Sequence, residues 1–247
     1  MERLSAPAPL VWRLATVQEV VAETTSARSL KLEVPEWRGH RPGQYLDVRL
    51  TAEDGYQAQR SFSIASPPEA DGLTLTIERI EDGEVSPYLA DEVRVGDQIE
   101  VRGPIGRPFT WVVQDGGPLL LVAGGSGLVP LMAMLRHRAA QRSLVLTGAL
   151  ISVRTPADAL YREELERLRM GEMLDVRWTS TRGAALSARD FTGRVDEAML
   201  TGLGLPATLA PRVFVCGPTG FVEHAANLLV DQGHDARRIQ TERFGPS

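Results

Sequence analysis

Two segments of the chain place glycines directly after an apolar stretch and before a helix-forming stretch. The first, LLLVAGGSGLVPLMAML, covers residues 119–135, and the second, VFVCGPTGF, covers residues 213–221. Glycine lets the backbone approach a pyrophosphate closely, and the N-terminus of the following helix offers free N–H groups to it. One glycine loop is weak evidence, because most such clusters are turns and GGSGLVP is not the GxGxxG pattern. Two loops of this design predict that the chain binds a dinucleotide.

A third segment, QRSFSIASP at residues 59–67, combines an arginine, hydroxyl groups and an aromatic ring. Alternation along an extended strand puts Arg60 and Phe62 on one face and Ser61 and Ser63 on the other. Read by itself, the segment is explained equally well by a strand with a surface arginine and ordinary serines.

A second anion site is predicted shortly after this segment. The turn EDGEV at residues 81–85 precedes a short helix over residues 86–93, with Ser86 as N-cap and Pro87 at the first helical position. Free N–H groups and the helix dipole favour an anion there. Arg60 and this helix end would hold the two phosphates of one ligand.

The elements around these segments change character once along the chain. Between residues 15 and 113, short runs alternate apolar and polar residues, at 30–34, 46–50, 73–77 and 99–101. This period of two predicts antiparallel strands with one buried face, closed as a small barrel or sandwich. After QDGGP at 114–118, strands apolar on both faces are predicted at 119–123, 144–150, 174–178 and 213–216, alternating with helices at 130–142, 157–170 and 220–232. That pattern predicts a parallel sheet with helices on both sides.

Composition narrows the class of protein. A chain of 247 residues is expected to form two domains, and a net charge of −5 without a basic run argues against a nucleic-acid partner. The single cysteine, Cys216, excludes a disulfide, a four-cysteine iron–sulfur cluster and a cysteine zinc site within this chain. The four histidines lack metal-ligand spacing and are interpreted as surface or packing residues, so no metal is expected. No apolar run approaches the roughly 20 residues of a membrane span, and we expect a cytoplasmic protein without a membrane partner.

RSFSIAS resembles the RxYSxxS flavin-binding motif of the ferredoxin–NADP reductase family. The resemblance extends over residues 11–244, because PGQYLDVRL (42–50), GEVSPYLADEVRVGDQIEVRGPIG (83–106), AGGSGLVP, VFVCGPTGF and TERFG follow in the family's order. The chain is most similar to the flavin reductases that serve oxygenases, in the version without a fused iron–sulfur domain. The resemblance implies an FAD-binding β-barrel domain at residues 1–114 and an NADP-binding α/β domain at residues 115–247.

For the flavin, the resemblance implies that Arg60 pairs with the FAD pyrophosphate and that Ser63 hydrogen-bonds near flavin N5. Phe62 would lie against the isoalloxazine or the ribityl chain. It replaces the family's tyrosine, which keeps an aromatic surface but loses a hydroxyl hydrogen bond. The other residues of the implied FAD site are Ser61, Ile77, Arg79, Glu84, Val85 and Ser86.

For the dinucleotide, the resemblance implies that Gly125, Ser126 and Gly127 hold the pyrophosphate. Cys216, Gly217, Pro218 and Thr219 would line the nicotinamide side. By itself, Cys216 is better read as a small apolar core residue, which is what free cysteines usually are. With the resemblance, its thiol is expected near nicotinamide C4, acting by shape and soft contact and not as a nucleophile.

Two segments that follow later predicted strands indicate which dinucleotide the chain prefers. NAD-preferring sites often place an acid about 20 residues beyond the glycine loop, but residues 150–154 offer only a hydroxyl and a cation. Ser180, Thr181 and Arg182 lie where the family reads the 2′-phosphate, and a guanidinium suits that dianion. NADPH is therefore expected to be preferred to NADH. If Arg182 is only a solvated loop residue, Arg154 is the next candidate.

The ending TERFG supplies the last implied residues. Glu242 matches an acid that the family places near the nicotinamide, although it could equally be a solvent-exposed carboxylate near the chain end, and Phe244 would cap the flavin. With Ser63 and Cys216, Glu242 completes the predicted catalytic set. The expected reaction is hydride transfer from NADPH to FAD, followed by single-electron release to a ferredoxin or oxygenase component. The alternatives are an NAD(P)H:flavin or ferric reductase with small diffusible acceptors and a flavin-binding regulator without turnover.

Overall fold

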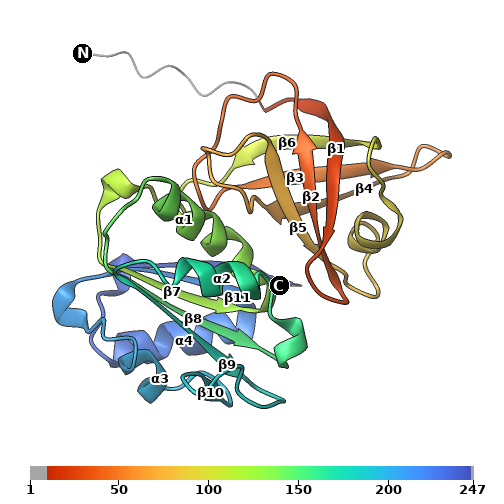
Figure 1. Cartoon of the computed structure of the whole chain (residues 1–247). Coiled ribbons are helices and arrows are strands. Elements are labelled where there is room, and N and C mark those ends of the chain that lie inside the picture. Colours follow the sequence, from red (N-terminus) through yellow and green to blue (C-terminus); the bar gives the residue numbers. More distant parts are fainter. Residues whose placement is uncertain (1–9, 246–247) are drawn as a thin grey trace, which may run out of the picture.

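The computed structural model describes residues 10–245, which form a β-barrel followed by a layered α/β unit (Figure 1). Residues 1–9 and 246–247 of the two predicted domains lie outside the described residues. No helix in the described part of the chain is both long and apolar enough to cross a membrane.

The barrel is a six-stranded sheet with the order β4-β3-β6-β1-β2-β5, in which every strand pair is antiparallel. A bridge between Ile64 and Leu75 joins β5 back to β4 and closes the sheet. The alternating apolar residues predicted to face inward, such as Leu30, Leu46 and Val101, are buried in one core. The predicted antiparallel barrel is therefore confirmed. Its strands are β1 (Trp12–Ala22), β2 (Ala27–Glu33), β3 (Tyr45–Thr51), β4 (Gln57–Ser63), β5 (Leu73–Glu78) and β6 (Gln98–Ile105).

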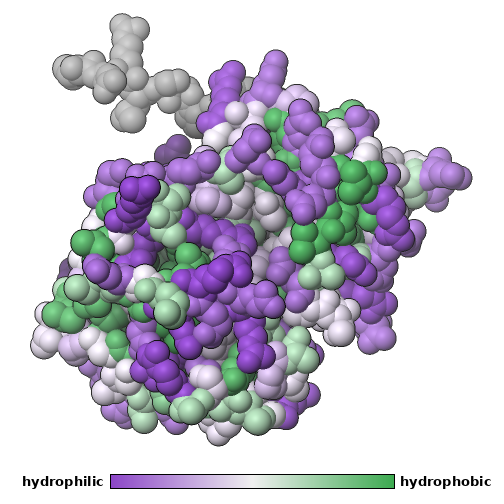
Figure 2. Space-filling model, viewed as in Figure 1, coloured by the Kyte–Doolittle hydropathy of each residue, from purple (hydrophilic) through white to green (hydrophobic). Residues whose placement is uncertain are grey.

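The second unit contains a six-stranded parallel sheet with the order β10-β9-β8-β7-β11-β12. Helices α1 (Leu128–Ala140) and α2 (Arg162–Leu168) cover one face, while α3 (Glu197–Thr201) and α4 (Thr219–Asp231) cover the other (Figure 1). The outer surface of α1 and α2 is largely hydrophilic (Figure 2). The predicted parallel sheet with helices on both sides is confirmed. Its strands are β7 (Leu119–Gly124), β8 (Thr147–Val153), β9 (Leu174–Ser180), β10 (Phe191–Thr192), β11 (Arg212–Pro218) and β12 (Ile239–Phe244).

Several predicted elements have different bounds in the structure. The strand predicted at 144–150 begins at Thr147, because Leu144 and Leu146 are exposed and lie before it. The helix predicted at 157–170 is reduced to α2, because Tyr161 adopts a left-handed backbone conformation with φ of 52° and interrupts it. The first helix spans 128–140 in place of 130–142. Strands β10 and β12 and helix α3 were not predicted.

The segment that joins the two units belongs to the second core. Phe109 and Trp111 precede the predicted boundary at residue 114, yet both pack with α1 and the parallel sheet. Trp111 also donates its indole N–H to the carbonyl oxygen of Gly116 at 2.8 Å. Ala27 and Ala65 of the barrel join the same cluster, so the two units share a packed apolar contact.

Candidate active site

A cleft of about 680 Å³ lies between the barrel and the α/β unit. The barrel contributes the turn between β1 and β2, the last residue of β5 and residues 79–81 after it, while the α/β unit contributes the ends of four parallel strands. Several predicted cofactor-binding residues meet on its walls: Arg79, Gly125, Ser126, Thr181, Pro218, Thr219 and Phe244. Ligands in open α/β sheets bind at the carboxyl ends of the strands, and this cleft has that location.

Ser63 ends β4 with a buried hydroxyl that has no protein partner. Its side chain belongs to a residue only 6% exposed, and Oγ makes no hydrogen bond within residues 10–245. A buried hydroxyl without a partner costs free energy, so this atom is suited to a ligand that supplies an acceptor. The preceding residue, Phe62, packs its ring partly against the barrel core. The end of β4 thus offers one buried hydroxyl, that of Ser63, to a ligand.

Arg60 is more exposed and faces the turn after β5. Its Nη2 lies 3.6 Å from Oε2 of Glu84, and that carboxylate also accepts a hydrogen bond from the Tyr56 hydroxyl at 2.8 Å. Both Arg60 and Glu84 are more than half exposed, so this pair is weak and leaves the guanidinium available to a phosphate.

The hydroxyl of Ser61 points to the outer face of the barrel. It donates to Asp47 at 2.7 Å, and the same carboxylate accepts from Arg102 at 2.7 Å. The guanidinium carbons of Arg102 and Arg49 lie 4.7 and 4.2 Å from the centre of the same Trp12 ring. Ser61 is thereby engaged by the barrel's own side chains.

The short helix after β5 is not capped by Ser86, although the sequence predicted that cap. Pro87 occupies the N-cap position of a five-residue π-helical segment, Tyr88–Glu92. The buried Ser86 hydroxyl accepts the backbone N–H of Ile80 at 3.1 Å and so ties the turn together instead of capping the helix. Val85 and Ile77 are fully buried, and Arg79 pairs with Asp91 at 2.8 Å.

The two glycine loops touch each other. β7 ends at Gly124, one tight turn follows over Gly125–Gly127, and α1 begins at Leu128. A Cβ at Gly127 would lie 2.2 Å from the carbonyl oxygen of Cys216, and one at Gly217 would lie 2.9 Å from that of Gly124. Side chains at these two positions would push the loops apart, so only glycine permits this contact between them.

Cys216 and Glu242 are a register pair on β11 and β12, two residues before the carboxyl end of each strand. Burial raises the pKa of Glu242 to about 7. Burial, and then the charge of Glu242, raises the pKa of the Cys216 thiol well above its ordinary value. The thiol is fully buried, so it suits a neutral contact and not a nucleophile.

Tyr45, the cross-strand neighbour of Ser63, is a residue that the sequence did not single out. It pairs with Ser63 across β3 and β4, and its ring would lie 3.4 Å from a Cβ at Gly106. Burial, then the charges of Asp47 and Glu242, raises the pKa of Tyr45. The PGQY sequence held the only signal, an aromatic residue at the start of a strand.

A second cavity of about 470 Å³ adjoins the cleft, since Ser152, Thr181 and Phe221 line both. Arg194 and His224 complete its polar lining, and neither was predicted. His224 donates its Nε2–H to the Val195 carbonyl oxygen at 2.7 Å, which assigns the proton to Nε2. Arg194 follows a two-residue strand, which is too short to be recognised from sequence periodicity.

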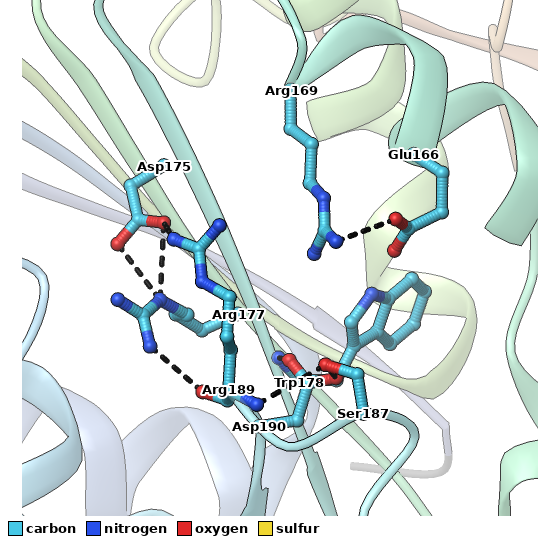
Figure 3. Close-up of polar contacts among 8 residues, drawn as sticks. All are labelled: Glu166, Arg169, Asp175, Arg177, Trp178, Ser187, Arg189 and Asp190. Carbon is cyan, nitrogen blue, oxygen red and sulfur yellow. Dashed lines mark hydrogen bonds and ion pairs between the residues drawn. The ribbon is translucent and has the colours of Figure 1, made fainter.

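Arg182 lies at the edge of this region and lines neither cavity. Its backbone N–H bonds the Arg154 carbonyl oxygen at 2.7 Å, and Ser180 Oγ donates to the same oxygen at 3.2 Å. The loop that carries Arg182 returns to β9, where Asp190 accepts from the Trp178 backbone N–H and from Ser187 (Figure 3). Ion pairs of Asp175 with Arg177 and Arg189 hold the strand and loop together (Figure 3).

Two protein-family models match the chain in the order of its two units. The oxidoreductase FAD-binding domain matches residues 13–110, and the oxidoreductase NAD-binding domain matches residues 121–227. The chain belongs to the ferredoxin–NADP reductase family. Within this family, the matches assign flavin binding to the barrel and dinucleotide binding to the α/β unit.

The family resemblance extends to characterised reductases and solved structures. The chain is 30% identical over 234 residues to the glycine betaine monooxygenase reductase subunit of Chromohalobacter salexigens, covering 92% of this chain and 62% of that protein. It is 31% identical over 243 residues to the ferredoxin reductase component of 3-ketosteroid-9-alpha-monooxygenase from Mycolicibacterium smegmatis, covering 92% and 64%. The chain thus spans less than two thirds of these relatives.

Two solved structures share the whole fold. The FAD/NAD-binding domain of nitric oxide dioxygenase from Vibrio cholerae superposes with a TM-score of 0.85 at 25% identity and covers 95% of this chain and 99% of that one. The Amycolatopsis cytochrome P450 reductase GcoB also gives 0.85 at 25% identity, covering 98% and 72%. Both the barrel and the parallel sheet therefore keep the family's architecture.

Proposed function

We propose that this chain is a reductase that takes a hydride from NADPH onto bound FAD and passes electrons singly to an oxygenase component or a ferredoxin. The observation that carries the proposal is the cleft shared by the two units. It is lined by Arg79 of the barrel and by Gly125, Ser126, Pro218 and Thr219 of the two glycine loops. A flavin held on the barrel and a dinucleotide held on the glycine loops would therefore meet in one cleft.

FAD and the dinucleotide would supply the redox chemistry when bound, and the protein would align them and exclude water. Ser63 would donate its free hydroxyl to the flavin, and Arg60 would hold the pyrophosphate. The touching glycine loops would hold the dinucleotide pyrophosphate at the N-terminus of α1. We assign residues 1–114 to the FAD-binding domain and residues 115–247 to the NADP-binding domain.

The preference for NADPH rests on the cations near the second cavity. Arg194 lines that cavity, and Arg182 and Arg154 lie on the adjoining loop and cleft. A guanidinium forms charge-assisted bonds with a phosphate dianion. We place the 2′-phosphate beside Arg194, with Thr181 and Arg182 at its rim.

The acceptor is inferred from the relatives' names. Both relatives described above are reductase components of monooxygenases, which receive electrons from such a subunit. We infer that an oxygenase component or a ferredoxin accepts the electrons here.

The decisive experiment mixes the FAD-loaded protein with NADPH and with NADH under anaerobic conditions. Rapid bleaching of the flavin, faster with NADPH, is expected. Ferricyanide should then be reduced at a rate indifferent to salt, whereas reduction through an acidic ferredoxin should fall between low and about 0.5 M salt. Bleaching without any ferredoxin-dependent rate, but with turnover of free FAD or FMN, would instead identify a flavin reductase. A flavin that neither nucleotide bleaches would indicate a non-catalytic flavin-binding protein.

A further inference from the structure

Arg136, on α1, bonds to both units of the chain. Its Nε and Nη2 donate to the two carboxylate oxygens of Glu164 on α2, at 2.8 and 2.6 Å. Its Nη1 donates to the carbonyl oxygen of Ala65 in the barrel, at 2.8 Å. The side chain is 18% exposed, so these bonds are largely shielded from water. A planar guanidinium can make this fork and the third bond together, and an ammonium cannot.

Tyr161 forms a second bridge directly against the first. The guanidinium carbon of Arg136 lies 4.7 Å from the centre of the Tyr161 ring. The Tyr161 hydroxyl donates to Thr76 on β5, and Thr76 lies 2.8 Å from the Ser29 hydroxyl on β2. Tyr161 is buried, and its left-handed backbone turns the ring toward the barrel before α2 begins. Burial strongly raises the pKa of Tyr161, so its hydroxyl stays protonated and able to donate.

The residues that these two bridges join lie next to the predicted flavin residues on one side and next to the first glycine loop on the other. Ala65 lies two residues beyond Ser63, and Thr76 immediately precedes Ile77. Ala65 and Thr74 are also joined by a backbone hydrogen bond of 2.8 Å, so the two points belong to one rigid part of the barrel. On the other side, Arg136 is carried by the helix that begins directly after Gly127. The bridges connect the flavin strand to the helix of the dinucleotide loop.

We propose that Arg136 is a positioning residue for hydride transfer, which sets the distance and angle between the flavin and nicotinamide sites through Ala65, Glu164 and Tyr161. This inference rests on the proposed function. A displacement of about 1 Å between reacting groups lowers a rate by about two powers of ten, so a bridge at this point controls the reaction without touching either ring. The inference concerns alignment and makes no claim that Arg136 binds a cofactor.

Other contacts along α1 keep the two units together when Arg136 is changed. His137 Nδ1 and Gln141 Nε2 lie 2.7 and 2.6 Å from the same oxygen of Glu69 in the barrel. Arg136→Lys is therefore expected to fold. Arg138 provides a matched control on the same helix, since it is 5% exposed and, among residues 10–245, its guanidinium bonds only Val145 and Glu172, both in the α/β unit.

The test compares Arg136→Lys with Arg138→Lys in the full FAD-loaded chain. Arg136→Lys should lower the anaerobic rate constant of flavin reduction at saturating NADPH by about 10–100-fold, with FAD content and the NADPH Kd within about twofold of wild type. With 4-deuterated NADPH, the isotope effect should rise as hydride transfer becomes fully rate-limiting. Arg138→Lys should leave the rate constant within about twofold. Tyr161→Phe, which removes only the hydroxyl, should give a smaller fall in the same direction.

A second readout does not need turnover. Spin labels are attached at Glu19→Cys on the barrel and Asp231→Cys on α4, which are both exposed in the wild type. The native Cys216 is fully buried and should not take up a label, so the distance between the two labels reports the distance between the units. Arg136→Lys should broaden or shift this distance distribution, and Arg138→Lys should not. Equal reduction rates and equal distance distributions in the two variants would overturn the proposal. If wild-type flavin is not bleached by either nucleotide, the proposed function fails, and the spin-label distances still decide whether Arg136 positions the units.

Discussion

The carbonyl oxygen of Cys216 occupies the space where a side chain at Gly127 would lie, 2.2 Å from its Cβ. Gly127 has a φ of −58°, which any residue tolerates, so the requirement for glycine is purely steric. This contact fixes the separation of the two glycine loops.

Gly127→Ala should therefore destabilise the protein by about 1–3 kcal/mol and weaken dinucleotide binding, because the loops must move apart. Urea unfolding and dinucleotide titration measure the two effects. Gly220→Ala is the stability control, since a Cβ there meets nothing within 4 Å and alanine favours helix α4 by about 0.5–1 kcal/mol. Equal stability changes in the two variants would contradict the steric explanation.

Ser63→Ala should separate the stability of the flavin-free protein from its affinity for FAD. The Ser63 hydroxyl has no partner within the described residues, so its removal should leave the unfolding free energy of the flavin-free protein unchanged or raised. FAD binding should weaken by about 0.5–1.5 kcal/mol, the value of one hydrogen bond. Calorimetry measures both quantities. Ser66→Ala should behave oppositely, because Ser66 Oγ accepts the Thr74 N–H at 2.9 Å. A less stable flavin-free Ser63→Ala protein with full FAD affinity would show that Ser63 is structural.

Arg60→Ala should release FAD on gel filtration while the fold survives. The only ion pair of Arg60 found within residues 10–245 is the exposed contact with Glu84, so little stability is lost with it. The flavin content of the eluted protein is read from its absorption spectrum, and circular dichroism checks the fold. Lys31→Ala, on β2, should keep its flavin. Full retention of FAD by Arg60→Ala would remove Arg60 from the pyrophosphate site.

Glu242 should make the stability of the flavin-free protein depend on pH. Burial raises its pKa from 4.5 to about 7, so between these values the folded protein holds a proton that the unfolded chain has released. The free energy of unfolding should fall as pH rises through this window, and the fall should be smaller in Glu242→Gln. Urea unfolding of both proteins at pH 5 and pH 8 measures the difference. Parallel profiles would mean that Glu242 titrates normally. In the loaded enzyme, Glu242→Gln should slow flavin reduction without abolishing it.

Arg194→Ala should raise the KM for NADPH by about one to two powers of ten and change that for NADH by less than about threefold, because a charge-assisted phosphate contact contributes about 1.5–3 kcal/mol. Steady-state kinetics with both nucleotides measures the split. Arg182→Ala is expected to have the smaller effect, since Arg182 lines neither cavity. The reverse order would place the 2′-phosphate at Arg182, and equal losses with both nucleotides would show that Arg194 supports the shared part of the site.

The sequence by itself determined both units of this fold, the antiparallel barrel and the parallel α/β sheet, because the patterns that predict their strands and helices are local. Alternation at residues 30–34 and 73–77 predicts half-buried antiparallel strands, and two glycine loops, each between an apolar run and a helix, together predict a dinucleotide site. Where local character misled, a specific tertiary fact was responsible. Leu144 and Leu146 are apolar but lie outside β8, and Tyr161 breaks the predicted helix to reach Thr76.

Only the tertiary structure decided which distant groups meet. Arg194 reaches the second cavity from behind a two-residue strand, and Tyr45 joins Ser63 through cross-strand register. Arg136 and Ala65 are separated by 71 positions along the chain, yet their bond of 2.8 Å links the two units. A hydrogen bond of this kind needs only one donor and one acceptor of ordinary type, so it leaves no periodicity or composition in the sequence. Only the packing of the two units against each other brings this donor and this acceptor together.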